Sequence, residues 1–247
     1  MSGHSKWSTI KRKKAAEDAK RGKIFTKVIK EITVAARQSG GDEENNPRLR
    51  QAILSARDAN MPADNIKRAI QKGTGELEGV SYEEAIFEGY GPGGVAIMME
   101  VMTDNRKRTV AELRHLLTKY NGNLGETGCV AWMFDKRSLI TIEKNGVDED
   151  LLLETILEGG GDDYLEEDDV YEITADPENV LDVRGELENA NFRIKTAEVT
   201  LVPQNTVKVL GDDISSLLKL MDALEDHDDI QKVSSNFDID EDELAEA

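Results

Sequence analysis

The sequence lacks the features that mark membrane, secreted and disulfide-stabilised proteins. It contains no run of about 18 apolar residues, so no segment is expected to cross a bilayer. Met1 is followed by polar residues instead of an apolar signal core, and the residue after it is Ser2, not the glycine that N-myristoylation requires. Cys129 is the single cysteine, which excludes an intrachain disulfide and is typical of a reducing compartment. We therefore expect a cytoplasmic protein that does not associate with membranes.

Signatures of nucleotide-dependent enzymes are also lacking. Gly89, Gly91 and Gly94 satisfy the spacing of a dinucleotide fingerprint, but a strand pattern follows where that fingerprint needs a helix N-terminus for the pyrophosphate. The Gly22-Lys23 pair is followed by isoleucine and not by the hydroxyl residue of a phosphate-binding loop. No catalytic residue is predicted from these motifs.

Metal and nucleophile patterns fail in the same way. The three histidines are scattered without ligand spacing, and Cys129 lies in an apolar context that favours a buried structural thiol. Asp238, Asp240 and Asp242 imitate the start of a calcium loop but lack its glycine and its distal glutamate. We predict a protein that is not an enzyme, with no metal, no cofactor and no small-molecule substrate.

What the sequence does have is a strong asymmetry of charge. Residues 1–78 carry 17 Lys or Arg and ten Asp or Glu, whereas residues 79–247 carry 14 and 40, so the two parts have net charges of +7 and −26. A basic block at one end of an acidic body attracts a polyanion there while the body repels it. The pattern indicates nucleic-acid binding at the N-terminal end, although a solvated lysine-rich helix face is the plainer alternative.

The basic block has helical periodicity. Apolar residues from Phe25 to Ala36 recur at helical spacing, while lysines fall on the other side, which predicts an amphipathic helix with a cationic ridge. Trp7, ahead of this helix, is an aromatic that can stack on a base. The candidate phosphate contacts of this segment are Lys6, Lys11, Arg12, Lys13, Lys14, Lys20, Arg21, Lys23, Lys27 and Lys30.

Two further helices are predicted after the ridge. Asn46 and Pro47 form a start signal, the break at 60–62 is short, and Gly73 is expected to stop the second helix. The outline is that of a helix-turn-helix, but an ordinary three-helix domain fits it equally well. If it enters a DNA groove, the candidate contacts are Arg48, Arg50, Arg57, Lys67, Arg68 and Lys72.

Beyond a glycine-containing linker the periodicity changes to strands and shorter helices. We expect a hairpin of 82–90 and 94–103, a helix, and a strand at 129–135. Elements from residue 139 to residue 202 then follow the order βαββαβ, with helices at 149–158 and 177–190 and strands at 162–166, 170–175 and 192–202. The remaining strand at 206–210, helix at 213–225 and strand at 230–237 have no partner of their own, so they are expected to complete the first unit.

The predicted fold class is therefore α+β and multidomain: an all-α domain followed by two ferredoxin-like units, the second inserted in the first. The expected divisions are 1–79 for the basic arm and helices, 80–135 plus 206–237 for the split unit, 136–205 for the inserted unit, and 238–247 for an acidic tail.

Five motifs in order carry a resemblance to a known family. They are Met1-Ser-Gly-His-Ser-Lys-Trp7, Lys14-Ala-Ala-Glu-Asp-Ala-Lys-Arg-Gly-Lys-Ile-Phe25, Asn60-Met-Pro-Ala-Asp-Asn-Ile-Lys-Arg-Ala-Ile70, Gly89-Tyr-Gly-Pro-Gly-Gly-Val95 and Thr103-Asp-Asn-Arg-Lys-Arg-Thr109. The sequence resembles the YebC family in these motifs up to about Phe134, with Cys129 where the family commonly has a small hydroxyl residue. The resemblance implies a non-catalytic cytoplasmic protein of three domains. Members are labelled DNA-binding transcriptional regulators, and the family is also similar to mitochondrial activators of cytochrome oxidase translation and to bacterial factors that assist ribosomes at proline-containing stretches.

The resemblance points to contacts in the N-terminal segment, at Lys6, Trp7, Lys11, Lys14, Lys20, Arg21, Lys23 and Lys27. A second candidate site is Asp104, Asn105, Arg106, Lys107 and Arg108. Asp104 or Asn105 can instead cap the helix that begins there, which is a purely structural role.

Two functions follow. The first is an RNA-binding or ribosome-associated translation factor whose basic arm grips ribosomal RNA, and the second is a DNA-binding transcriptional regulator using residues 47–72. We favour the first, because the acidic body limits the approach of a duplex and no coiled coil or strongly apolar dimer surface is evident. The sequence does not fix the oligomeric state.

Overall fold

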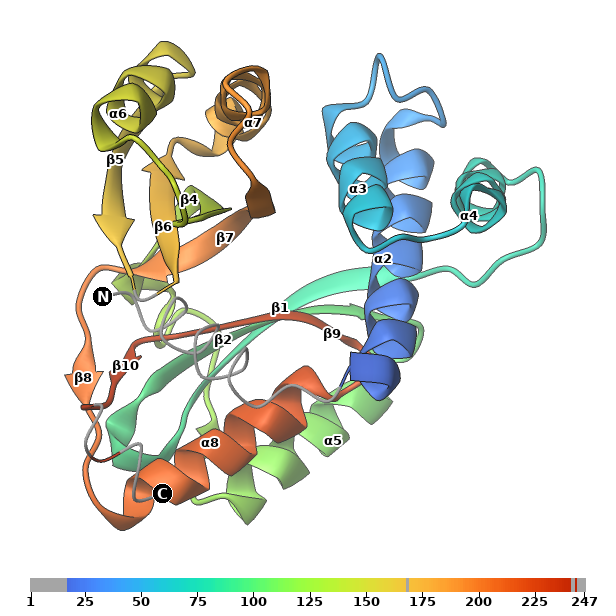
Figure 1. Ribbon diagram of the computed structural model, residues 1–247. Helices are drawn as coiled ribbons and strands as arrows, with labels where there is room; N and C mark the ends of the chain where they lie inside the picture. The colour runs from blue at the N-terminus through green and yellow to red at the C-terminus, as the bar shows by residue number, and fades with distance from the viewer. Residues whose placement is uncertain (1–16, 168, 241–242, 244–247) are drawn as a thin grey trace. The chain divides into compact units, whose positions relative to one another are not determined.

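The structure is a computed structural model that describes residues 17–167, 169–240 and 243. The chain divides into two compact units: the part up to Phe134 together with the part from Pro203 onward, and the segment Asp135–Val202 between them. A helical N-terminal region is followed by β-sheets with helices on them, which confirms the predicted α+β fold class (Figure 1). Within the described residues, no helix is both long and apolar enough to span a bilayer.

The N-terminal region contains α2 (Glu17–Ser39), α3 (Pro47–Asp58) and α4 (Ala63–Thr74). Their apolar stripes meet in one small core that includes Ile32, Leu49 and Ile53. The predicted start signal of α3 is confirmed, since Asn46 Oδ1 accepts from the Leu49 backbone N–H at 3.0 Å. The amide nitrogen of Asn46 also donates to the carbonyl oxygens of Ala35 and Gly40, so this buried side chain ties α3 to the end of α2.

Gly73 does not stop α4 as the sequence predicted. The helix continues through Thr74, and Gly75 ends it in the left-handed conformation with φ of 84°. Gly73 is instead the point of closest approach between α4 and α2: a Cβ there would lie 2.5 Å from the Thr33 carbonyl oxygen. The glycine is required by packing and not by the turn.

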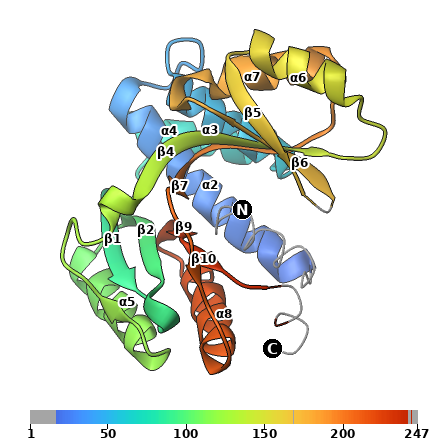
Figure 2. The same cartoon turned by 90° about the vertical axis from the view of Figure 1, so that its left-hand side faces the viewer.

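The first unit also contains a four-stranded sheet of order β3-β1-β2-β9. Its elements are β1 (Glu83–Tyr90), β2 (Ala96–Thr103), α5 (Arg106–Lys119), β3 (Asn123–Leu124), α8 (Asp212–Glu225) and β9 (Ile230–Ser235). Helices α5 and α8 lie side by side on one face of this sheet (Figures 1 and 2). The buried side chains of β2, α5, α8 and β9 form a single core between them.

In the predicted split unit, the strand at 129–135 is wrong, and the strand at 206–210 is present but shorter and differently paired. Residues 129–133 form a turn and the 3-10 helix η2 (Ala131–Met133), and the next strand begins only at Phe134. The short β8 (Val207–Lys208) pairs in parallel with β10 (Phe237–Asp238), outside the main sheet. The sheet still has the strand order of a ferredoxin-like fold. Strands β2 and β3 are joined by α5 in a βαβ unit, and β1, which precedes this unit in the sequence, lies between β2 and β3 and pairs with both.

The second unit is a complete βαββαβ fold. Its elements are β4 (Phe134–Glu143), α6 (Glu149–Glu158), β5 (Gly161–Glu166), β6 (Val170–Ala175), the 3-10 helix η3 (Pro177–Asn179), α7 (Val180–Asn189) and β7 (Ile194–Pro203). The sheet order β5-β6-β4-β7 is that of a ferredoxin-like fold. Helices α6 and α7 cover one face (Figure 2), where Ile140, Ile156 and Leu187 are fully buried.

Candidate nucleic-acid interface

Lysines on the first half of the α2 ridge contact the end of α8. Lys23 forms an ion pair of 2.9 Å with Asp226, and Lys27 Nζ donates to the Glu225 carbonyl oxygen at 2.9 Å. The unpaired carbonyls at a helix C-terminus carry partial negative charge, so cations are favoured there. These two lysines therefore have an intramolecular role that the sequence did not indicate. Lys20 and Arg21 belong to α2, and Lys6, Trp7, Lys11, Arg12, Lys13 and Lys14 lie outside the described residues.

The fourth lysine of the ridge is not on the surface at all. Lys30 is 7% exposed, and its ammonium group donates to the carbonyl oxygens of Met102 and Asp228 and to Asp229 Oδ1, at 3.3, 2.8 and 3.0 Å. The prediction that Lys30 faces a phosphate is corrected here: α2 packs on α3 and α4 with its apolar side, and Lys30 on the polar side is buried against Met102 of β2 and the two residues before β9.

Asp229 is the centre of the buried polar network that receives Lys30. The residue is 4% exposed, and its Oδ2 accepts from Arg108 Nη2 at 2.6 Å, from Thr109 Oγ1 at 2.8 Å and from Thr103 Oγ1 at 3.1 Å. Burial acts to raise the pKa of this carboxyl, but the hydrogen bonds from Arg108, Thr109 and Lys30 outweigh burial and hold the pKa well below its usual range. Sequence reasoning missed Asp229 because it lies in a run of acidic residues that reads as a solvated loop.

Most residues of the second candidate site, 104–108, form hydrogen bonds or ion pairs within the protein, either in this network or at the start of α5. Asn105 Oδ1 accepts from the Arg108 backbone N–H at 3.2 Å and caps the helix. Arg106 pairs with Glu83 at 2.8 Å, and Arg108 pairs with Asp104 at 2.9 Å as well as with Asp229. Lys107 is exposed, with no hydrogen bond or ion pair to the part of the chain that the structure describes.

The arginines of the helix-turn-helix-like segment also have internal partners. Arg48 bridges Glu31 and Glu84 at 2.7 and 2.6 Å. Burial acts to lower the pKa of Arg48, but the hydrogen bonds to Glu84 and Glu31 have the larger effect. The pKa therefore lies above its usual value, and the guanidinium stays cationic. Arg50 donates to the carbonyl oxygens of Glu43 and Glu44, and Arg57 lies 3.7 Å from the Glu43 carboxylate. These contacts hold the α2–α3 connection.

The exposed cations of this segment are Arg57 on α3, 61% of whose side chain is accessible, and Lys67 and Arg68 on α4. Lys67 and Arg68 are exposed and have no hydrogen bond or ion pair with any described residue, while Lys72 is half-buried against Gly79. Over residues 17–79 the basic and acidic side chains nearly balance, at 12 and ten, whereas residues 1–16 contain five basic side chains and no acidic one. The excess positive charge of the basic end is therefore concentrated in residues 1–16.

A groove of about 1080 Å³ runs between α2, α5 and the α8–β9 turn. It is lined by both signs of charge, among them Lys23, Asp226 and Asp229, so it does not select an anion. Glu112, His227 and Asp229 lie close enough to share a metal ion, and His227 Nε2 is 3.0 Å from Glu112 Oε2. The set fits a cation poorly, because both oxygens of Asp229 already accept from positively charged donors.

The turn before the second unit carries an exposed tryptophan. Trp132 is 67% exposed, and its ring nitrogen donates to the Cys129 carbonyl oxygen at 3.2 Å. The turn is organised on the buried Glu88, whose carboxylate accepts from the backbone N–H groups of Gly128, Val130 and Ala131. An exposed indole held in this way offers a face on which a base can stack. Sequence reasoning assigned this segment to a strand and did not identify the residue.

Comparison with known proteins gives consistent matches over nearly the whole chain. The family model "TACO1/YebC protein N-terminal domain" matches residues 5–76, and "TACO1/YebC second and third domain" matches residues 82–237. A "Probable transcriptional regulatory protein GSU1074" from Geobacter sulfurreducens is 60% identical and is aligned over 99% of this chain and 98% of its own length. One from Pelotomaculum thermopropionicum is 59% identical over 98% of this chain and all of its own length.

A solved structure is also similar. The crystal structure of the conserved hypothetical protein Aq1575 from Aquifex aeolicus matches with a TM-score of 0.83 and 47% identity, and the match covers 91% of this chain and 93% of that one. The shared architecture therefore extends over both units.

Proposed function

Because the chain belongs to the TACO1/YebC family, we propose that it is a non-catalytic regulator of gene expression that acts by binding nucleic acid. Relatives about 60% identical carry the name of probable transcriptional regulatory proteins, which supports the regulatory role. Binding is assigned to the basic end, since the rest of the chain has a net charge of −26 and repels a polyanion.

The preferred target is structured or single-stranded RNA, including that of the ribosome. The observation that carries this choice is the pairing of cations in the helical region: Arg48 is held by Glu31 and Glu84, and Arg50 by the carbonyl oxygens of Glu43 and Glu44. Too few cations remain on α3 and α4 for a groove-reading motif, and the uncompensated charge lies in residues 1–16, next to Trp7. Lysines interleaved with an aromatic suit the phosphates and unstacked bases of RNA.

The second candidate is a DNA-binding transcriptional regulator, which the names of the relatives favour. It would use Lys67 and Arg68, which are exposed on α4, the second helix of the helix-turn-helix outline. The two candidates thus depend on different cations of the same basic end.

Charge reversal at each place separates the candidates. We would measure binding of a labelled ribosomal RNA fragment and of duplex DNA by fluorescence anisotropy, over a range of salt, for K11E/K13E and for K67E/R68E. If the arm binds RNA, K11E/K13E weakens RNA binding on every sequence and lowers the slope of log affinity against log salt by roughly 0.7 for each phosphate that the arm no longer neutralises. K67E/R68E should then have the smaller effect.

The matched control is K136E/K195E, which reverses two exposed lysines of the acidic second unit and should leave binding unchanged. In cells, deletion of residues 2–14 should release the protein from ribosomal fractions of a sucrose gradient, as nuclease treatment should. A protein that prefers one duplex about a thousandfold over random duplex, depends on K67E/R68E and ignores ribosomes would refute the RNA proposal in favour of the DNA one.

A further inference from the structure

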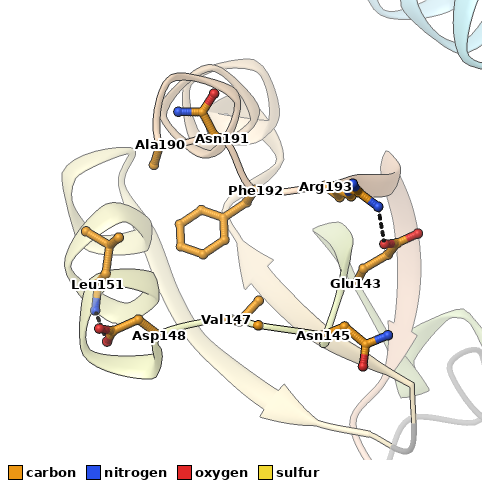
Figure 3. A pocket seen from close by; sticks show the side chains of 10 residues that line it. Glu143, Asn145, Val147, Asp148, Leu151, Ala190, Asn191, Phe192 and Arg193 are labelled. Carbon is orange, nitrogen blue, oxygen red and sulfur yellow. Dashed lines mark hydrogen bonds and ion pairs between the residues drawn. The ribbon is translucent and has the colours of Figure 1, made fainter.

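The second unit has a small pocket at one end of its sheet. The pocket lies between the β4–α6 turn and the α7–β7 turn and has a volume of about 410 Å³. The ring of Phe192 points into the space between Leu151, Ala190 and Val147, so one part of the pocket wall is apolar, and the rest of the lining is polar (Figure 3). Two tight turns build the walls, with positive φ at Gly146 and Asn191. An apolar side chain of a partner can pack against this apolar wall while its neighbours meet the polar lining.

The rim of this pocket is negative. Asp148 caps α6 by accepting from the backbone N–H groups of Asp150 and Leu151, and Glu149 and Asp150 extend the acidic first turn. Of the described residues lining the pocket, Arg193 is the one cation, and it lies 3.5 Å from Glu143. A cationic neighbour of the inserted side chain would meet carboxylates there.

The surface next to the pocket has the same combination of apolar and acidic groups. Leu151 of α6, which lines the pocket, is 46% exposed, and Glu154 and Glu158 are exposed on the same helix. Side chains three or four positions apart share a helix face, so Leu151, Glu154 and Glu158 form one face of α6, whereas Leu153 and Leu157 lie on another. An exposed leucine flanked by carboxylates suits a partner segment in which an apolar side chain stands between cations.

The net charge of the unit decides which kind of partner fits. Between Asp135 and Val202 the sequence has 20 acidic and six basic side chains, a net charge of −14. Nucleic acid and acidic proteins are repelled by this charge, whereas a basic partner is attracted and oriented by it.

We propose that the pocket, together with Leu151 and the carboxylates of Glu154 and Glu158 beside it, forms a docking surface for a lysine- and arginine-rich protein segment that inserts one apolar side chain beside Phe192. The apolar side chain supplies the buried anchor, and the acidic rim selects and orients the cationic residues around it. This inference concerns protein binding by the second unit, and it does not depend on whether the basic end binds RNA or DNA.

The probe is a synthetic peptide of about a dozen lysine, arginine and glycine residues with a central leucine, titrated into the full chain by isothermal calorimetry and by amide NMR. The expected result is saturable binding, with shifts confined to α6 and to the turns at 144–148 and 190–193. Affinity should fall as salt is raised, because the rim charges are exposed to screening. A peptide with glycine in place of its leucine should bind at least about tenfold more weakly.

Variants of the chain locate the site. Leu151→Ser removes an exposed apolar wall, and Glu154→Lys reverses an exposed rim charge; each should weaken peptide binding by about tenfold. Glu178→Lys makes the same charge reversal on an exposed residue of η3 and should leave affinity within about twofold. Equal binding of the leucine and glycine peptides, an unchanged affinity in Leu151→Ser, or shifts outside these elements would overturn the proposal.

Discussion

At the scale of single residues, the dominant feature of the basic end is the pairing of its charges inside the protein. Lys30 and Asp229 are almost fully buried, and each has hydrogen bonds to more than one partner. A buried ion pair is costly to desolvate, but removing one member is costlier still because the other charge stays behind. We therefore regard Asp229 as the residue that ties α2, through Lys30, and α5, through Arg108 and Thr109, to the start of β9.

Asp229→Asn should lower the free energy of unfolding by about 3 kcal/mol or more, because Lys30 loses its counter-charge while buried. Urea denaturation followed by circular dichroism measures this. The control is Asp226→Asn, which removes the partner of Lys23 from an exposed site with 67% of the side chain accessible and should cost less than about 1 kcal/mol. Equal effects of the two substitutions would contradict the assigned role of Asp229.

The same carboxyl should make stability depend on acid pH. Its pKa is lower in the folded protein than in the unfolded chain, where an aspartate has a pKa of about 4. Its stabilising contribution is thus present above about pH 5 and is lost as the pH falls toward the folded-state value. The difference in urea midpoint between the parent protein and Asp229→Asn should be smaller at pH 3 than at pH 6. An equal difference at both pH values would exclude a contribution of the Asp229 carboxylate to the pH dependence of stability.

Glu88 is a second residue whose charge is used internally. Burial acts to raise its pKa, but three backbone N–H groups of the turn at 128–131 lower it below its usual range. Glu88→Gln places an amide N–H donor opposite those backbone donors and should lower the free energy of unfolding by about 1 to 3 kcal/mol. It should also alter Trp132 fluorescence in a Trp7→Phe background, while the exposed Glu126→Gln should change neither. An unperturbed turn in Glu88→Gln would argue against this anchor.

At the scale of elements, α2 illustrates what the sequence could and could not predict. Its apolar residues predicted the face that packs on α3 and α4, because helical period and burial are local properties. The contacts of Lys27 and Lys30 with residues about 200 positions away depend on tertiary placement, so the pattern could not reveal them. The predicted limits of α6 are confirmed at 149–158, where Asp148 supplies a local cap, whereas the two-residue strands β3, β8 and β10 lack any such signal.

Gly73→Ala tests the packing of α4 on α2. Alanine favours a helix by up to about 1 kcal/mol over glycine, yet here its Cβ would lie 2.5 Å from the Thr33 carbonyl oxygen and 2.7 Å from Ala36 Cβ. We expect the free energy of unfolding, measured by urea denaturation, to fall by about 1 to 3 kcal/mol. Gly22→Ala is the matched control in α2, because nothing lies within 4 Å of its added methyl group, and it should be neutral or stabilising. If both substitutions stabilise the protein, the close approach is not a constraint.

At the scale of the whole molecule, function is divided by charge. The proposals assign nucleic acid to the basic end and a basic protein segment to the acidic second unit, so each part is expected to repel the partner of the other. This division requires that the second unit folds on its own contacts. Its buried residues form a core separate from that of the first unit, and its sheet contains strands from the inserted segment alone.

Excision of the inserted segment tests the converse requirement, that the first unit folds without the second. The segment enters after Phe134 and leaves before Pro203, and the Gln204 backbone N–H donates to the Met133 carbonyl oxygen at 2.9 Å, so its two ends are adjacent. Joining Phe134 to Pro203 through a short glycine linker should therefore leave α5, α8 and their sheet intact, since closing so short a gap costs little chain entropy. We expect a soluble protein with a cooperative thermal transition, nucleic-acid binding equal to that of the full chain and no binding of the basic peptide. A molten or insoluble product would mean that the first unit needs the second in order to fold, and retention of peptide binding would place the docking surface outside the second unit.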